Sequence, residues 1–262
     1  MNGQGLTNEF FAMDTGVHGP GLDTPDQKAT LLKELGYPGI GWTPPNVGPM
    51  LKALDAEHLK METLYVGAHI GPGEEKFKPE LPSDIELLKG RETIIWVFIT
   101  SKSDKPSDAT ADERALSVLT EIAEMAKRSG LTLALYPHTG LWLERVQDAV
   151  RLVDKLHRPD VGLTFNLCHC LRVGDGKKIP DLLALARPKL FVVTINGADW
   201  EGDWNRLIQP LDAGDYNIPQ FLGQLKRINY RGPIGLQHYG IKGDARENLQ
   251  RSMDAWRKFT RP

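Results

Sequence analysis

The chain has 262 residues, of which 40% are hydrophobic and 25% are charged, the composition of an ordinary globular protein. Its formal net charge of -2 excludes the overall positive field that attracts nucleic acids or anionic membranes. The sequence has no apolar run of about 20 residues, so we expect no membrane-spanning helix. Its start, MNGQGLTNEFFAMD, has neither the basic nor the apolar region of a signal peptide. We therefore leave the compartment open between the cytoplasm and export with a leader already removed.

The first third of the chain alternates strand-like and helix-like patterns. An apolar run at 9–14 predicts a first strand. The helix that follows has a clear start, because Thr24, Pro25 and Asp26 supply an N-cap, a proline at the first position and an acidic first turn. The other expected elements here are strands at 39–43 and 61–67 and helices at 24–36, 46–59 and 83–89.

The same alternation continues to the end of the chain. Strands are expected at 93–100, 131–137, 161–169, 190–196 and 233–238, and helices at 112–129, 141–156, 178–187, 218–229 and 244–259. Eight strands alternating with eight helices in about 250 residues predict an α/β fold, a single (β/α)8 TIM barrel over residues 1–262. A doubly wound sheet would usually carry a G-x-G-x-x-G turn after its first strand, and AMDTGVHGP does not match it.

The longest connection, residues 197–216, has no strong periodicity and is long enough to predict a functional loop or lid. It contains Trp200 and Trp204, whose indole faces are suited to stacking on the apolar faces of sugars. Packing of the loop onto the barrel explains both tryptophans equally well, so the two interpretations stay open.

In a (β/α)8 barrel the carboxyl ends of the strands meet at one mouth, where active sites lie. Four of the seven histidines fall at these ends. A single histidine at a strand end is usually structural, but four that meet at one mouth favour a functional site. The polar side chains at the strand ends are Asp14, Thr43, His69, Lys102, Tyr136, His138, Asn166, His169, Thr194, Asn196, Gln237 and His238.

The two cysteines, Cys168 and Cys170, lie two apart at the end of the sixth predicted strand. Side chains alternate along a strand, so both thiols are expected on one face. A disulfide between them would be strained, and a zinc site would need a second pair of ligands. We interpret them as small, half-buried thiols.

Three segments of the sequence resemble one known family. They are the N-x-x-H spacing of Asn166 and His169 after VGLTF, the segment QPLDAGDYNIPQFLGQLKRINYRGPIGLQ, and LKELGYPGIGW near the start. They are similar to the xylose isomerase-like superfamily of sugar isomerases and epimerases, which also includes endonuclease IV-type repair enzymes. The resemblance implies that His169 contacts the substrate.

The resemblance also implies a divalent metal held by Glu, Asp, His and Glu at strands five to eight. The matching positions here are Tyr136, Asn166, Thr194 (or Asn196, if the register shifts by two) and Gln237. None of them is a carboxylate, whereas Mg²⁺ and Mn²⁺ prefer hard, anionic oxygens. We therefore expect no tightly held cofactor and at most a weakly bound divalent metal.

These features predict an isomerase- or epimerase-like enzyme that acts on a small carbohydrate or keto-sugar by removing a proton next to a carbonyl. Histidine titrates near neutral pH, so His138, His169 and His238 are the expected catalytic groups. Amide side chains are suited to donating hydrogen bonds to an enolate oxygen. The expected substrate-binding residues are Tyr136, Asn166, Thr194, Asn196, Gln237, His69, Lys102 and Trp200.

Other functions remain open. A keto-sugar lyase or hydratase starts from the same enolate, and a barrel that has lost its metal would bind carbohydrate without turnover. A repair nuclease is the least supported, because it needs a cluster of metals and a basic surface. We expect a small carbohydrate as partner and neither nucleic acid nor membrane. Pairing of barrels into a homo-oligomer is considered through an apolar edge at Trp256 and Phe259.

Overall fold

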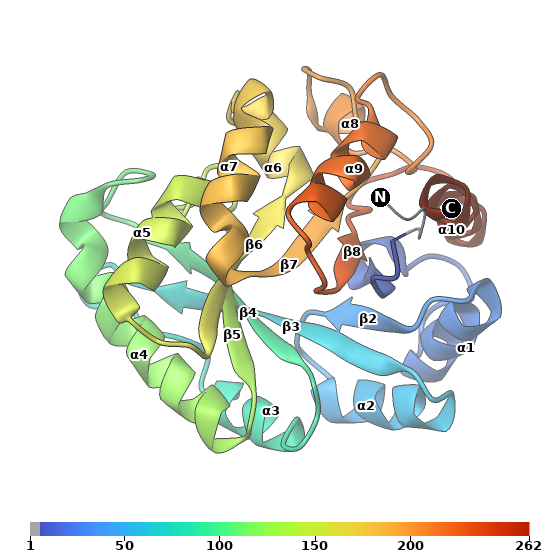
Figure 1. The fold of residues 1–262 in the computed structure, drawn as a ribbon. Coiled ribbons are helices and arrows are strands. Elements are labelled where there is room, and N and C mark those ends of the chain that lie inside the picture. Colours follow the sequence, from blue (N-terminus) through green and yellow to red (C-terminus); the bar gives the residue numbers. More distant parts are fainter. Residues whose placement is uncertain (1–5, 262) are drawn as a thin grey trace.

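The computed structural model describes residues 6–261, and its parallel strands close into a barrel (Figure 1). The first five residues, part of the start considered for a signal peptide, lie outside the described residues. The strands of residues 6–261 are β1 (Phe10–Met13), β2 (Gly39–Trp42), β3 (Lys60–His69), β4 (Ile94–Thr100), β5 (Thr132–Leu135), β6 (Val161–Asn166), β7 (Leu190–Ile195) and β8 (Ile234–Leu236). Each strand pairs with the next, and β1 pairs with β8, so the carboxyl ends meet at one mouth.

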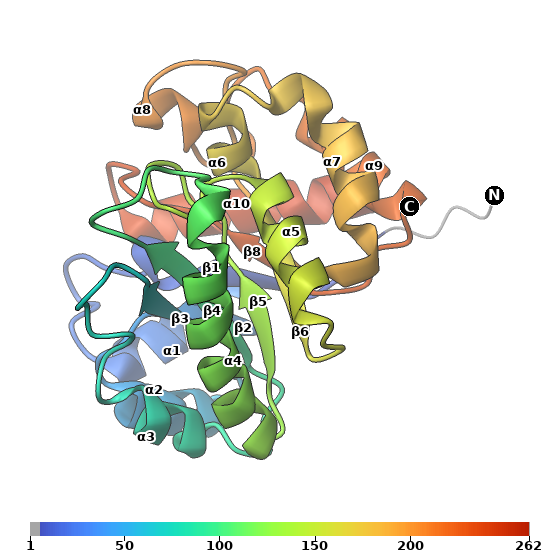
Figure 2. The same ribbon diagram turned by 90° about the vertical axis from the view of Figure 1, so that its left-hand side faces the viewer.

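Helices pack around the outside of this barrel (Figures 1 and 2). Those of residues 6–261 are α1 (Pro25–Leu35), α2 (Val47–Ala56), α3 (Leu81–Leu87), α4 (Asp112–Arg128), α5 (Val146–Leu156), α6 (Leu167–Arg172), α7 (Ile179–Ala186), α8 (Trp204–Leu207), α9 (Ile218–Arg227) and α10 (Ala245–Thr260). Helix α1 starts as its sequence predicts. The Thr24 side chain accepts a hydrogen bond from the N–H of Gln27, and the Gln27 side chain accepts one from the N–H of Thr24.

The predicted (β/α)8 barrel is confirmed, but three local predictions are wrong. The strand expected at 161–169 ends at Asn166, because that side chain caps α6 and turns the backbone into a helix. Cys168 and Cys170 therefore lie on a helix, and both are buried free thiols rather than half-buried ones. The helix expected from residue 141 begins only at Val146. The connection 197–216, predicted to be a functional loop or lid, contains the short helix α8.

The core has two parts. Most buried apolar side chains lie between the strands and the surrounding helices. A smaller, aromatic-rich cluster fills the barrel interior. It comes from residues on the opposite face of the strands and from Tyr136 just after β5: Phe11, Met13, Trp96, Ala134, Tyr136 and Val192. Of the apolar edge considered at Trp256 and Phe259, Phe259 is partly buried and Trp256 is buried. The Trp256 ring stacks on Phe10 with centroids 4.4 Å apart, and the residue is only 7% exposed, because α10 turns it toward β1.

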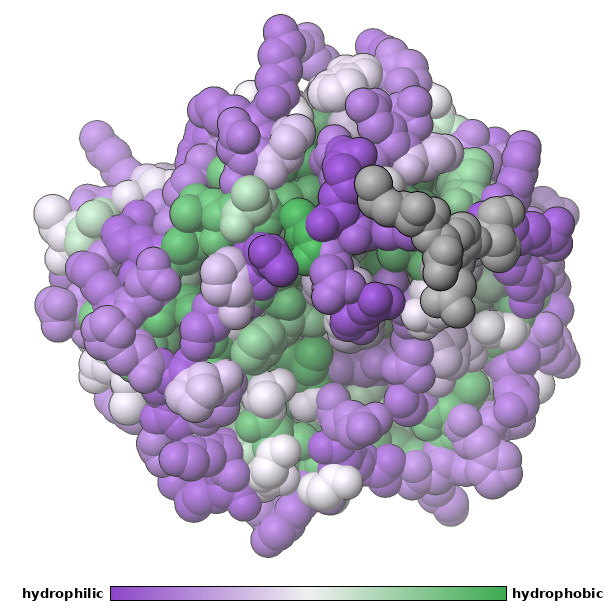
Figure 3. Space-filling view, viewed as in Figure 1, coloured by the Kyte–Doolittle hydropathy of each residue, from purple (hydrophilic) through white to green (hydrophobic). Residues whose placement is uncertain are grey.

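Hydrophilic side chains cover most of the face shown in Figure 3, and hydrophobic ones show in the recesses between them. Two of the exposed large side chains, Trp200 and Tyr239, follow β7 and β8 and so lie toward the mouth. Within residues 6–261, no helix has the length and the apolar character needed to cross a bilayer.

Candidate active site at the barrel mouth

Tyr136 lies in the barrel interior, directly after β5. Its ring packs edge-on against Trp96 and Tyr65, with centroids 4.7 and 5.0 Å apart. The side chain is 1% exposed, and burial raises the pKa of its hydroxyl well above the ordinary value. The phenol is therefore neutral at physiological pH and keeps its proton.

Asn166 is both the last residue of β6 and the N-cap of α6. Its Oδ1 accepts from the main-chain N–H of His169 at 3.3 Å and from Sγ of Cys168 at 3.1 Å. With the oxygen fixed in this way, the amide nitrogen faces Tyr136 and donates to the phenol oxygen. The N-x-x-H spacing thus has a structural cause, because the cap places His169 in the first turn of α6.

His138 and His169 lie against each other, with ring centroids 4.0 Å apart. Nδ1 of His138 is 2.9 Å from the main-chain oxygen of Thr139, which can only accept, so this nitrogen carries the proton. Nδ1 of His169 instead accepts from the main-chain N–H of Thr139 at 3.3 Å. The neutral rings are therefore opposite tautomers. Nε2 is an acceptor in His138 and an N–H donor in His169.

Burial sets the charge of this pair. It lowers the pKa of His138, and it lowers the pKa of His169 well below the ordinary value. Repulsion from a charged His138 lowers the pKa of His169 further. Both rings are thus neutral at pH 7, the state in which one can take up a proton and the other can donate a hydrogen bond.

Gln237, directly after β8, is a second side chain that hydrogen-bonds the Tyr136 hydroxyl. Its Oε1 accepts from the main-chain N–H groups of His238 and Tyr239, at 2.9 and 3.1 Å, and from the Thr15 hydroxyl at 3.1 Å. The side chain also hydrogen-bonds Tyr136. Tyr136 is therefore connected to the ends of both β6 and β8.

Thr194 and Asn196, the two candidates at the end of β7, are placed differently. Thr194 lies opposite Asn166 in the sheet, and its buried hydroxyl has no hydrogen-bond partner among residues 6–261. Asn196 lies beyond the strand, and its amide donates at 2.7 Å to the carbonyls of Gly197 and Leu207. Thr194 is thus level with Asn166, whereas Asn196 holds the loop that follows.

His238 lies on the β1 side of the mouth. A Cβ added at Gly16 would come within 2.5 Å of the Cβ of His238, so the two backbones are closely packed there. Burial, followed by the charge of His18, lowers the pKa of His238 to about 4. Its buried Nε2 has no hydrogen-bond partner in the described part of the chain.

His69 and Lys102 line a different groove, of about 620 Å³, beside the ends of β3 and β4. Nδ1 of His69 is 2.6 Å from the hydroxyl oxygen of Thr100, which fixes the ring at the strand end. Lys102 is exposed, and its main-chain N–H donates to Glu74. The structure thus assigns these two candidates to a neighbouring surface rather than to the imidazole pair.

The long connection after β7 brings one tryptophan to the imidazole pair. The ring of Trp204 meets that of His169 edge-on at 5.5 Å, and the Arg172 guanidinium lies 5.4 Å from the Trp204 ring. Trp200 instead packs against Tyr216 at 4.7 Å and remains 44% exposed. Both tryptophans were identified from the sequence of the long connection, but only the folding of α8 against α6 decides which one touches His169.

Asp14 was not among the expected site residues, although it follows β1 directly. Its Oδ2 accepts from the main-chain N–H of Thr43 at 2.8 Å. Burial raises its pKa, whereas hydrogen bonds to Thr43 and the charge of Lys28 act in the opposite direction. Its place at a strand end was visible in the sequence, but its burial depends on how the first two strand ends pack.

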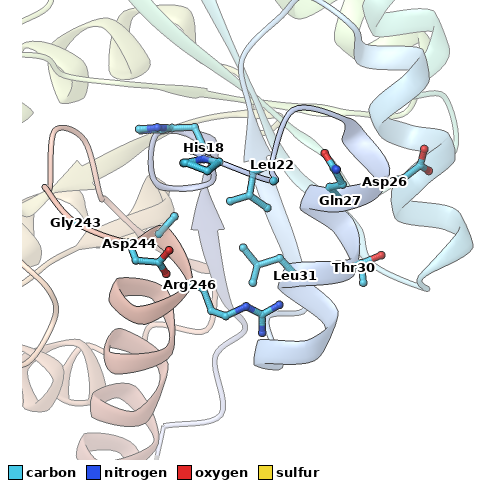
Figure 4. Close-up of a pocket in the computed structure, with 13 residues that line it drawn as sticks. His18, Leu22, Asp26, Gln27, Thr30, Leu31, Gly243, Asp244 and Arg246 are labelled. Atoms are coloured by element: carbon cyan, nitrogen blue, oxygen red, sulfur yellow. The ribbon is translucent and has the colours of Figure 1, made fainter.

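A groove of about 470 Å³ lies between the β1–α1 connection and the start of α10 (Figure 4). In Figure 4, Leu22 and Leu31 lie between His18 and Arg246. Arg246 is already paired with Glu34 of α1. We do not include this groove in the candidate site.

The residues at the implied metal positions do not fit a divalent ion. They are a buried neutral phenol, two amides and a hydroxyl, without a carboxylate, whereas such ions are held mainly by anionic oxygens. Asn166 is moreover already bonded to Tyr136, and so is Gln237. Across residues 6–261, no group of three or more His, Cys, Asp or Glu side chains is arranged to hold an ion.

Comparison with known proteins gives one family and several similar folds. The sequence profile described as xylose isomerase-like TIM barrel matches residues 29–259. A 3-keto-D-glucoside 4-epimerase from E. coli has a TM-score of 0.78 and 16% identity, covering 96% of this chain and 100% of that one. A D-allulose 3-epimerase from Methylomonas sp. has a TM-score of 0.75 and 14% identity, covering 98% and 100%.

A probable 3-DHS dehydratase from Bacillus anthracis is similar as well, with a TM-score of 0.74 and 14% identity over 95% of this chain and 98% of that one. No curated protein sequence matches the chain. At such low identities, the likeness to solved structures shows the fold alone.

Proposed function

This chain belongs to the xylose isomerase-like TIM-barrel family, and on that premise we propose that it isomerises or epimerises a small carbohydrate or keto-sugar. The reaction begins with removal of a proton from the carbon next to a carbonyl. The observation that carries the proposal is the pair of touching, neutral imidazoles in opposite tautomers. The keto-glucoside and allulose epimerases of similar fold support this class of substrate.

Nε2 of His138 takes the proton from the carbon, and the electrons of the broken C–H bond form the double bond of an enolate. The carbonyl oxygen gains the negative charge, and the Nε2–H of His169 donates a hydrogen bond to it. Addition of a proton from solvent to the opposite face of the same carbon gives an epimer, and His138 releases the proton that it took to solvent. Delivery of the proton from His138 to the former carbonyl carbon gives an isomer, if the proton of the neighbouring hydroxyl moves at the same time to the former carbonyl oxygen.

The same enolate leads to a second candidate function. If it expels a hydroxide from the next carbon, the enzyme is a keto-sugar lyase, and the reverse reaction is a hydration. The similarity to a probable dehydratase supports keeping this candidate. Both reactions use the same base and differ only in the step after proton removal.

The test follows the hydrogen next to the carbonyl by proton NMR in D₂O. Methyl 3-keto-D-glucoside and D-allulose serve as separate probes, with chelator present. We expect the wild-type protein to exchange that hydrogen for deuterium and then to form a second sugar. An epimer or isomer identifies the main proposal, and an unsaturated product identifies the lyase. Calorimetric binding without any exchange contradicts catalysis and identifies a carbohydrate-binding barrel.

A further inference from the structure

Two side-chain amides meet at the hydroxyl of Tyr136, and both have a fixed orientation. The oxygen of Asn166 is held by the N–H of His169 and the thiol of Cys168, so its amino group faces the phenol and donates to it. The oxygen of Gln237 is likewise held by two main-chain N–H groups. Its amino group is therefore the part that remains for the hydrogen bond with Tyr136.

This arrangement determines where the phenol proton can go. A phenol oxygen has lone pairs to accept hydrogen bonds and one proton to donate. Here Asn166 and Gln237 are both donors, so neither can receive the proton of Tyr136. The hydrogen bonds found within residues 6–261 supply no other acceptor for it. A buried donor without a partner is costly, and such a group in a native fold calls for an explanation.

We propose that the Tyr136 hydroxyl donates its hydrogen bond to the carbonyl oxygen of the bound keto-sugar and thereby takes the place of a divalent cation. This inference rests on the proposed function. When the proton leaves the carbon, charge develops on that oxygen, and a preorganised donor in a water-poor site stabilises it. The phenol and the Nε2–H of His169 together form the oxyanion site, and the proton stays on Tyr136 throughout.

The distances agree with a shared ligand. The ring of Tyr136 lies 5.9 Å from that of His169 and 6.3 Å from that of His138, centroid to centroid. The base and both donors therefore lie close enough together to act on one carbonyl and its neighbouring carbon. Asn166 and Gln237, at positions that the family resemblance assigns to a cation, instead orient this phenol. Their amides donate to its oxygen and leave its proton free, whereas a carboxylate would accept that proton.

Tyr230 provides a matched control. It is also a buried tyrosine, 6% exposed, but its hydroxyl donates to the carbonyls of Pro233 and Phe191 at 2.7 and 3.1 Å. Its proton is therefore fully used within the protein, at the amino end of β8. Loss of the Tyr230 hydroxyl removes structural bonds only, whereas loss of the Tyr136 hydroxyl removes the proposed donor.

The experiment measures deuterium exchange of methyl 3-keto-D-glucoside by the wild type, Tyr136→Phe and Tyr230→Phe. We expect Tyr136→Phe to lower kcat by about 10²–10³-fold, the loss typical of one oxyanion donor, with KM within a few-fold. Tyr230→Phe should lower Tm and keep the wild-type rate. The wild-type rate should be the same in chelator and in Mn²⁺.

The outcomes separate this inference from the proposed function. If the wild type exchanges and Tyr136→Phe is equally fast, the inference is wrong and the proposed function stands. More than tenfold stimulation of the wild type by Mn²⁺ also overturns it. If the wild type does not exchange, the proposed function fails, and calorimetry with the same glucoside decides. Binding that is tenfold weaker in Tyr136→Phe supports the donor, and equal or absent binding overturns it.

Should Tyr136→Phe fail to fold, 3-fluorotyrosine is placed at position 136. The ring and both amide contacts are kept, while the hydroxyl becomes a stronger donor. A few-fold higher exchange rate with an unchanged Tm is then expected, and an unchanged rate contradicts the proposal.

Discussion

At the mouth of the barrel, Tyr136 is bounded by amides and neutral imidazoles, whereas near the amino end of β3 the buried Glu62 lies among charged side chains. Glu62 is 6% exposed, and one of its carboxyl oxygens has no hydrogen-bond partner among residues 6–261. Burial, then the charge of Glu9, raises its pKa to about 7, and Lys60 acts against this. At the mouth the amides are neutral by residue type, and burial keeps the phenol protonated and the imidazoles unprotonated, whereas Glu62 is neutral only when it gains a proton.

The different origin of neutrality explains why the mouth of the barrel is suited to catalysis and the region around Glu62 is not. The neutral groups of the mouth hold lone pairs and protons in defined places at pH 7, which general acid–base chemistry requires. Glu62 at the amino end instead makes folding depend on pH without forming a comparable set of oriented donors and acceptors. Substitutions at each end test this contrast.

The largest effect is expected from the imidazole pair. His138→Gln replaces the proposed base with an amide that cannot take up a proton, so exchange should fall by about 10²–10⁴-fold. His169→Gln keeps an N–H donor and should lose much less. Deuterium exchange of the keto-glucoside measures both. His157→Gln, at the end of α5, is the control. Equal losses for the two variants, or the reverse order, contradict the assigned tautomers.

Acid is expected to destabilise the mouth through His238. Its pKa is about 4 in the fold and about 6.5 when unfolded, so the unfolded state binds more protons between these values. The stabilising contribution is complete above about pH 6.5 and is lost as pH falls toward 4, by up to about 3 kcal/mol. Urea unfolding should show a smaller fall from pH 7 to 4.5 in His238→Gln than in the wild type. An identical fall in both proteins would mean that His238 is not the group responsible.

The barrel itself was predictable from the sequence, because eight apolar runs alternating with helical patterns allow few other folds. The end of β6 was not. The run VGLTFNLCHC stays apolar past Asn166, so it fits a longer strand as well as a strand followed by a capped helix. Only the bond from the N–H of His169 to Asn166 decides for the helix.

The candidate site was predictable as residue types but not as chemistry. His138 and His169 were expected at the mouth, yet their opposite tautomers depend on the carbonyl and the N–H of one residue, Thr139. The direction in which the main-chain carbonyl and N–H of a loop residue point cannot be predicted from the residue types. For the same reason Tyr136 was expected to bind substrate at a position without a carboxylate, whereas the orientation of its amide partners came from the structure.

At the amino end, Glu62→Gln should stabilise the protein at alkaline pH. The folded pKa of about 7 lies above the unfolded value, so the fold retains a proton that the unfolded chain loses. The contribution of Glu62 is complete below about pH 4.5 and is lost as pH rises through 7. The glutamine variant should therefore be more stable by roughly 1–3 kcal/mol at pH 8 and nearly equal at pH 4. Denaturant unfolding at both pH values measures this, and lower stability at pH 8 contradicts the assignment.

The smallest effect on stability is expected for Lys60→Met. This variant removes the surface ion pairs of Lys60 and tests whether they, rather than the burial of Glu62, stabilise the amino end of β3. Nζ of Lys60 lies 2.9 Å from Glu9 and 3.1 Å from Glu92, and the lysine side chain is 46% exposed. Exposed ion pairs contribute about 0.2–1 kcal/mol and are screened by salt. At pH 8 the variant should lose less than about 1 kcal/mol at low salt, and the difference should disappear near 1 M NaCl. A loss of several kcal/mol that persists in salt would mean that Glu62 is ionised in the fold and held by Lys60, and the amino end would then be a charged site rather than a protonated one.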